Sequence, residues 1–196
     1  MDLALEIAGT VLGVVYVILA IRENPWCWPI GIGNAALFLV VTASARLFGQ
    51  AALQAVYVVV SVYGWYEWLH GGEGRTALAV SRTPRRWAVS LAAAWVVATV
   101  AFGLLLKLRM GDPLPFVDAG TTALSLVAQW MATRKWLENW LVWMAVNVAS
   151  VPMFLSQQRF AMAVFYGVLL VMAVFGHREW RRSMTAGAGA SSAPPA

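Results

Sequence analysis

The chain has 196 residues, of which 61% are apolar and 12% are charged, and its formal net charge is +5. Soluble domains average about 45–50% apolar and about 25% charged residues, so this composition indicates an integral membrane protein. The basic residues lie between apolar runs, which explains the charge by membrane topology and argues against a nucleic-acid partner. One cysteine, Cys27, excludes an internal disulfide.

A helix that crosses a membrane needs about 20 mostly apolar residues. Seven segments fit, and they are expected at about 3–21, 26–43, 49–69, 86–107, 116–133, 139–156 and 160–177. Proline and glycine separate several of them, because both residues end helices. The small residues near the end predict a disordered cytoplasmic tail over 183–196.

The basic residues predict the orientation of these spans. Ten of the 14 follow odd-numbered spans, namely Arg22, Arg75, Arg82, Arg85, Arg86, Arg134, Lys135, Arg178, Arg181 and Arg182. Because basic loops stay in the cytoplasm, we expect the N-terminus outside and the C-terminus inside. Five tryptophans near span ends are expected to lie in the headgroup zone as anchors, namely Trp65, Trp68, Trp87, Trp136 and Trp180.

The chain contains an internal repeat. The third and seventh spans align when 47–68 is placed against 159–180, an offset of 112, and they share the ending Gly-x-x-Glu-Trp at 64–68 and 176–180. An offset of 115 aligns Glu23-Asn24 and Trp28 with Glu138-Asn139 and Trp143, and an offset of 111 aligns 8–10 with 119–121.

A single span between two triplets restores their direction, so the sequence predicts a 3+1+3 arrangement of parallel repeats. We expect one transmembrane domain over 1–182, with repeat one at about 3–70, a linker helix at about 86–107 and repeat two at about 116–182.

Polar side chains recur at helical spacing inside the spans. Trp140, Trp143 and Asn147 are spaced i, i+3, i+7, which places two indoles and one amide on a single helix face. Similar stripes hold Gln54 with Tyr57 and Ser61, and Gln129 with Ser125 and Thr122; the second span adds Trp26, Trp28 and Asn34. Any one of these residues could instead be an ordinary helix contact or a membrane anchor. Together they favour an interior site for a neutral or weakly charged, hydroxylated ring compound.

Other chemistries have little support in the sequence. His70 and His177 lack further metal-ligand residues nearby, and no Walker motif is present. We therefore expect no metal, no cofactor and no enzyme activity. Pro29 and Pro152 fall inside spans 2 and 6, so we expect kinks at matching places in the two repeats.

Three motifs resemble the PnuC family of vitamin transporters. They are Glu-Asn-Pro-Trp-Cys-Trp-Pro-Ile-Gly at 23–31, Tyr-Gly-Trp-Tyr-Glu-Trp at 63–68, and Glu-Asn-Trp-x-x-Trp-x-x-x-Asn at 138–147. The resemblance covers about residues 3–182. It implies an all-α bundle similar to the sugar-transporter (SWEET-like) fold, a homotrimer in a bacterial inner membrane, and uptake of nicotinamide riboside by facilitated diffusion with trapping by cytoplasmic phosphorylation.

The resemblance also implies residue roles. Trp140 and Trp143 would contact the pyridine ring, and Asn147 would bond the ribose hydroxyls or the carboxamide. The remaining contacts would come from Gln54, Tyr57, Gln129, Trp28 and Asn34.

Three alternatives stay open. The chain could carry a related ring vitamin such as thiamine or riboflavin, since both tryptophans would also suit those rings. It could be the substrate-binding subunit of an ATP-driven transporter, which would need a docking motif in the loop at 71–85. A seven-span receptor is the third, although a receptor does not need the internal repeat.

Overall fold

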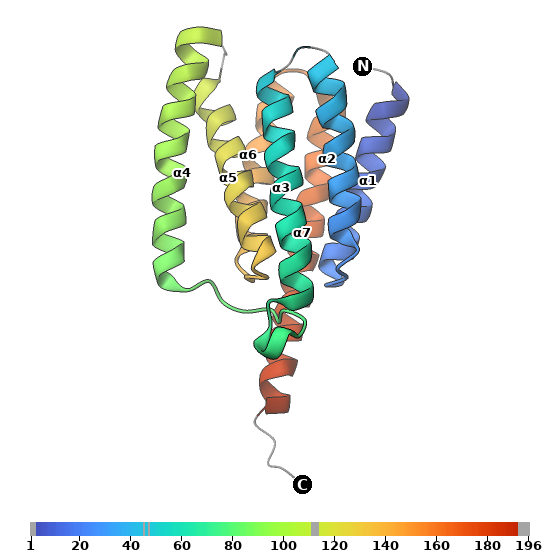
Figure 1. Ribbon diagram of the computed structural model, residues 1–196. Helices are drawn as coiled ribbons and strands as arrows, with labels where there is room; N and C mark the ends of the chain where they lie inside the picture. The colour runs from blue at the N-terminus through green and yellow to red at the C-terminus, as the bar shows by residue number, and fades with distance from the viewer. Residues whose placement is uncertain (1–2, 45, 47, 111–113, 192–196) are drawn as a thin grey trace. The chain divides into compact units, whose positions relative to one another are not determined.

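The computed structural model describes residues 3–44, 46, 48–110 and 114–191. Over these ranges the chain forms seven α-helices: α1 (Leu3–Ile21), α2 (Cys27–Ser44), α3 (Phe48–His70), α4 (Arg85–Leu105), α5 (Pro115–Thr133), α6 (Asn139–Ser156) and α7 (Phe160–Ser191) (Figure 1). A π-helical turn, Leu106–Met110, directly follows α4. The first six helices begin and end within two residues of the expected spans.

The end of α7 differs from the sequence prediction. The composition predicts disorder from residue 183, but the helix continues to Ser191. Alanine is the best helix former, and a glycine in a helix costs only about 1 kcal/mol, so this segment can extend an existing helix. Residues 192–196, the rest of the predicted tail, lie outside the described residues.

Four helical segments among the described residues are long and apolar enough to cross a membrane by length and composition: Cys27–Ser44, Arg85–Leu108, Asn139–Ser156 and Phe160–Ala186. The apolar part of α1, Ile7–Ile21, is shorter. Polar residues such as Gln54 and Glu67 in α3, and Asp118 and Gln129 in α5, lower the hydropathy of those two helices.

The internal repeat has one register. Helices α5, α6 and α7 begin at a constant offset from α1, α2 and α3, and the ends of the first two pairs keep the same offset. This offset is 112, the sequence separation of Glu23 and Lys135. The turns repeat as well, because Glu23 and Lys135 both have positive φ, as do Arg46 and Gln158. The offsets of 115 and 111 suggested by short motifs are therefore wrong, since they align a few identical letters at the expense of helix boundaries.

The expectation of matching proline kinks is also wrong. Pro29 is the third residue of α2, where its missing N–H would have no helical partner in any case. Pro152 lies in the interior of α6. In the common register neither position has a proline at its equivalent, which is Leu141 for Pro29 and Val40 for Pro152.

The chain forms two compact units. Unit 1 comprises residues 1–79, 133–135 and 182–196, and unit 2 comprises residues 80–132 and 136–181. Within unit 1, α2 packs against both α1 and α3 (Figure 1). Within unit 2, the Trp95 indole of α4 donates a hydrogen bond to the Gly120 carbonyl of α5 at 3.0 Å.

The helix α4 buries only Gly103, and valines such as Val89 and Val97 are exposed. Apolar side chains with this exposure suit a lipid environment.

The five tryptophans expected as membrane anchors divide into two groups. Trp65 and Trp87 are exposed, as that role requires. Trp68, Trp136 and Trp180 are buried, so the anchor interpretation is wrong for these three. Each of the three indoles packs against another tryptophan of the protein: Trp68 against Trp28, Trp180 against Trp140, and Trp136 against Trp87.

Candidate functional site

The Trp140 indole is a packing centre of unit 2. It is 4% exposed and meets the Trp180 indole of α7 edge-on, with ring centroids 5.3 Å apart and an interplanar angle of 84°. Gly176 provides the space, because a Cβ there would lie 2.6 Å from the Trp140 ring. This explains the Gly-x-x-Glu-Trp ending of the seventh span: the glycine leaves room for an indole, and the tryptophan packs against that indole.

Unit 1 holds the equivalent cluster. Trp28 is fully buried and meets Trp68 of α3 edge-on at 5.4 Å and 89°. A Cβ at Gly64 would lie 2.5 Å from the Trp28 ring. Tyr16 of α1 adds a second edge contact at 6.1 Å. The trio Trp28, Gly64 and Trp68 thus matches the trio of unit 2 in the common register, and the partner of Trp28 in the repeat is Trp140 and not Trp143.

Four of the residues predicted for the site have a buried polar atom with no hydrogen-bond partner within the described residues. They are the indole nitrogens of Trp28 and Trp140 and the side-chain carbonyl oxygens of Asn34 and Asn147. An unpaired buried polar atom costs about 1–3 kcal/mol. Native proteins retain such groups mainly where a ligand or water satisfies them. Unit 1 contains one such indole donor and one amide acceptor, and so does unit 2.

The helix α6 presents the predicted stripe to the protein interior. Trp140 and Asn147 are buried and Trp143 is partly buried, whereas Leu141 and Val148 are exposed. This division agrees with the spacing of i, i+3, i+7 that the sequence showed.

The three other predicted site residues lie on α3 and α5. Gln54 and Tyr57 are partly buried on α3, and Gln129 is buried on α5. A buried glutamine in an apolar helix is costly unless its amide is bonded, which fits an interior polar position.

Sequence reasoning missed a cluster of charges in unit 1. The sequence pattern marks Lys135 only as a loop charge, yet it is 5% exposed. Its Nζ lies 3.2 Å from Glu23 Oε2 and 4.5 Å from the centre of the Trp68 ring. Glu23 and Lys135 are equivalent positions of the repeat, and opposite charges at equivalent positions were a signal that could have revealed this pair.

The neighbouring Arg134 makes a second link in the same unit. Its guanidinium donates to the Tyr63 hydroxyl at 2.7 Å and to the Glu67 carboxylate. The two basic residues of the turn after α5 are therefore joined to the end of α3 and to the turn after α1.

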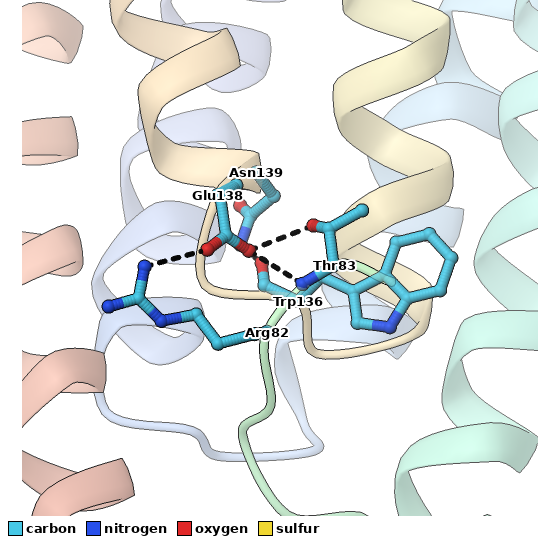
Figure 2. Close-up of polar contacts among 5 residues, drawn as sticks. All are labelled: Arg82, Thr83, Trp136, Glu138 and Asn139. Atoms are coloured by element: carbon cyan, nitrogen blue, oxygen red, sulfur yellow. Dashed lines mark hydrogen bonds and ion pairs between the residues drawn. The ribbon is translucent and has the colours of Figure 1, made fainter. Parts of the chain in front are cut away.

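Glu138 organises a third polar cluster, in unit 2 (Figure 2). Its carboxylate accepts hydrogen bonds from the Thr83 N–H and hydroxyl, both at 2.8 Å, and from Arg82 at 3.0 Å. The Asn139 amide donates to the Trp136 carbonyl at 2.6 Å, and Leu137 N–H donates to the Ser81 carbonyl. This part of the motif at 138–147 thus holds the loop before α4.

These hydrogen bonds set the acidity of Glu138. Burial raises its pKa, but hydrogen bonds from Thr83, from the backbone N–H of Glu138 itself and from Arg82 together lower the pKa by more than burial raises it. The pKa of Glu138 therefore lies below its ordinary value of 4.5, and the group is a carboxylate at neutral pH.

Apolar helices with exposed aliphatic faces, together with interior amides and indoles, define a polytopic membrane protein with polar groups in its interior. The family model for the nicotinamide mononucleotide transporter matches residues 3–182, so the chain belongs to that family. The PnuC resemblance suggested by the three motifs is thereby confirmed.

Curated relatives cover nearly the whole chain. The nicotinamide riboside transporter PnuC of Escherichia coli is 30% identical, over 91% of this chain and 85% of its own length. The riboflavin/roseoflavin transporter RibM of Streptomyces davaonensis is 32% identical, over 89% and 83%. A solved structure, described as the vitamin B3 transporter PnuC, has a TM-score of 0.71 over 94% of this chain and 83% of its own, at 24% identity.

Proposed function

We propose that this protein takes up nicotinamide riboside across a membrane. The observation that carries the proposal is the family match over residues 3–182, together with relatives named as nicotinamide riboside transporters from Escherichia coli and Neisseria mucosa. The unpaired atoms of the candidate site suit this compound, because its ribose hydroxyls and carboxamide both donate and accept hydrogen bonds.

The proposed substrate contacts are the eight residues expected from the sequence: Trp28, Asn34, Gln54, Tyr57, Gln129, Trp140, Trp143 and Asn147. Among them, Asn147 and Asn34 would bind hydroxyl or amide donors. Trp143 is the indole with the most freedom to meet the pyridinium, since Trp28 and Trp140 already pack against other indoles. A cation over an aromatic face gains about 0.5–2 kcal/mol.

The proposed architecture is 3+1+3, with parallel three-helix repeats, α4 as the linker and a SWEET-like fold. The common register of the helix boundaries supports the repeats. The single helix α4 between the two triplets supports their parallel direction, because one extra span restores the direction of the chain. A homotrimer in a bacterial inner membrane, with the N-terminus outside and the C-terminus in the cytoplasm, completes the proposal on the basis of resemblance and of the basic loops.

The proposed mechanism is facilitated diffusion. The candidate site uses amides and indoles, which bind a solute without the cost of burying a protein charge. Net uptake would then follow from phosphorylation of the substrate in the cytoplasm by a separate kinase.

Riboflavin is the second candidate, because RibM is as similar to this chain as PnuC of Escherichia coli is. Calorimetry of the purified protein with nicotinamide riboside, thiamine and riboflavin tests both candidates. Saturable binding of nicotinamide riboside, and its uptake into vesicles without ATP or an ion gradient, is the expected result. Binding of riboflavin or thiamine alone would overturn the first proposal.

A further inference from the structure

The buried ammonium of Lys135 contacts Trp68, and Trp68 contacts Trp28, which is one of the predicted site residues. Its Nζ is 4.5 Å from the centre of the Trp68 ring, within the range of a cation–π contact. Trp68 in turn meets Trp28 edge-on at 5.4 Å. All three residues belong to unit 1, so this chain of contacts lies within one compact part of the protein.

The Trp28 indole is fixed on several sides. Trp68 and Tyr16 hold it by edge contacts, and Gly64 leaves no free space beside the ring. Its N–H is buried and has no acceptor in the described part of the chain. The direction of this donor is therefore set by the rings around it, and Trp68 is the one that carries a cation.

Burying a lysine side chain in a protein interior costs free energy. Removing an ammonium from water is costly, and a well-packed apolar residue often serves stability as well as a buried ion pair does. Lys135 pairs with the Glu23 carboxylate at 3.2 Å, and that side chain is itself partly exposed. A buried Lys135 ammonium has a clear use if it keeps the Trp68 ring in place.

We propose that Lys135 is a positioning residue for substrate binding, which acts through Trp68 to hold the Trp28 N–H toward the substrate. The inference rests on the proposed function, because it assumes that Trp28 donates to the ligand. Lys135 itself is not assigned a substrate contact.

The test measures affinity and folding separately. In Lys135→Met, which keeps the unbranched apolar stem but removes the ammonium, we expect the dissociation constant for nicotinamide riboside to rise by about 3- to 30-fold, the range that cation–π contacts span from exposed to desolvated sites. Lys135→Arg keeps the charge and should restore affinity to within about 3-fold. Arg82→Gln is the matched control, because Arg82 is a basic loop residue that pairs with Glu138, and its affinity should equal that of the wild type.

A double-mutant cycle with Trp68→Phe identifies the route. If Lys135 acts through Trp68, Lys135→Met should change affinity by less in the Trp68→Phe background than in the wild type. Additive effects would overturn the proposed route. A folded Lys135→Met protein with unchanged affinity would show a purely structural role and overturn the inference.

Wild-type binding is measured first. Absence of wild-type binding would overturn the proposed function and this inference together. Normal wild-type binding with an insensitive Lys135→Met protein would overturn the inference alone.

Discussion

Lys135 Nζ and Glu23 Oε2 lie 3.2 Å apart, and the two residues occupy equivalent positions of the internal repeat. Both follow the last turn of a helix and both have positive φ. The same backbone turn thus carries a carboxylate in one repeat and an ammonium in the other.

Removing the Glu23 carboxylate should cost more stability than removing the Lys135 ammonium. Glu23→Gln leaves a cation whose side chain is 6% exposed, whereas Lys135→Met leaves a carboxylate whose side chain is 23% exposed and better hydrated. We expect a loss of about 3 kcal/mol for Glu23→Gln. The double variant Glu23→Gln/Lys135→Met should lose less than the sum, by about 1–2 kcal/mol. Thermal unfolding in detergent measures the cycle, and additive losses would show that the pair is not coupled.

Gly176 should not tolerate even a methyl group. A Cβ there would lie 2.6 Å from the Trp140 ring, so Gly176→Ala forces the buried indole to move and should cost about 1–3 kcal/mol. Gly167→Ala is the control in the same helix, because no atom lies within 4 Å of its Cβ position apart from its chain neighbours and the helix backbone around it. That change should be neutral or stabilising by about 0.5 kcal/mol. Equal melting temperatures for the two variants would contradict the packing role of Gly176.

Asn147→Ala should separate binding from folding. The Asn147 carbonyl oxygen has no partner in the described residues, so its removal relieves an unpaired polar group and should leave the melting temperature nearly unchanged. Affinity for nicotinamide riboside should fall by about 5- to 100-fold, the equivalent of one or two lost hydrogen bonds. Val148→Ala, on the exposed face of α6, is the control for both measurements. An Asn147→Ala protein with lower stability and normal affinity would instead indicate a packing role.

Glu138 should make the stability of the protein dependent on pH in acid. Its pKa is lower in the folded protein than the ordinary value of 4.5, so its contribution is fully present above about pH 4.5 and is lost as the pH falls through the folded-state value. Glu138→Gln should therefore lower the free energy of unfolding at pH 7 by about 1–2 kcal/mol, and the melting temperature should fall with it. The difference from the wild type should shrink below pH 4.5.

The control for that experiment is Glu73→Gln. Glu73 belongs to the same connection between α3 and α4 as Arg82 and Thr83, but its side chain is exposed. Its melting curves should follow those of the wild type at every pH. A constant gap between Glu138→Gln and the wild type across the pH range would contradict the ionised-acceptor role of Glu138.

The sequence by itself determined the class of protein, the helices and the stripe on α6. Helix bounds followed from apolar runs between proline and glycine, because the bilayer allows few alternatives to a helix of about 20 residues. The placement of Trp140, Trp143 and Asn147 on one face of α6 followed from helical periodicity alone.

Only the tertiary structure decided the pairing of distant residues. The single register of the repeat, the glycines that receive Trp28 and Trp140, and the burial of Lys135 all depend on which helix ends and turns meet. A lysine in a basic loop has the same sequence pattern whether it faces water or an indole, because periodicity reports the face of one helix and not what packs against a turn.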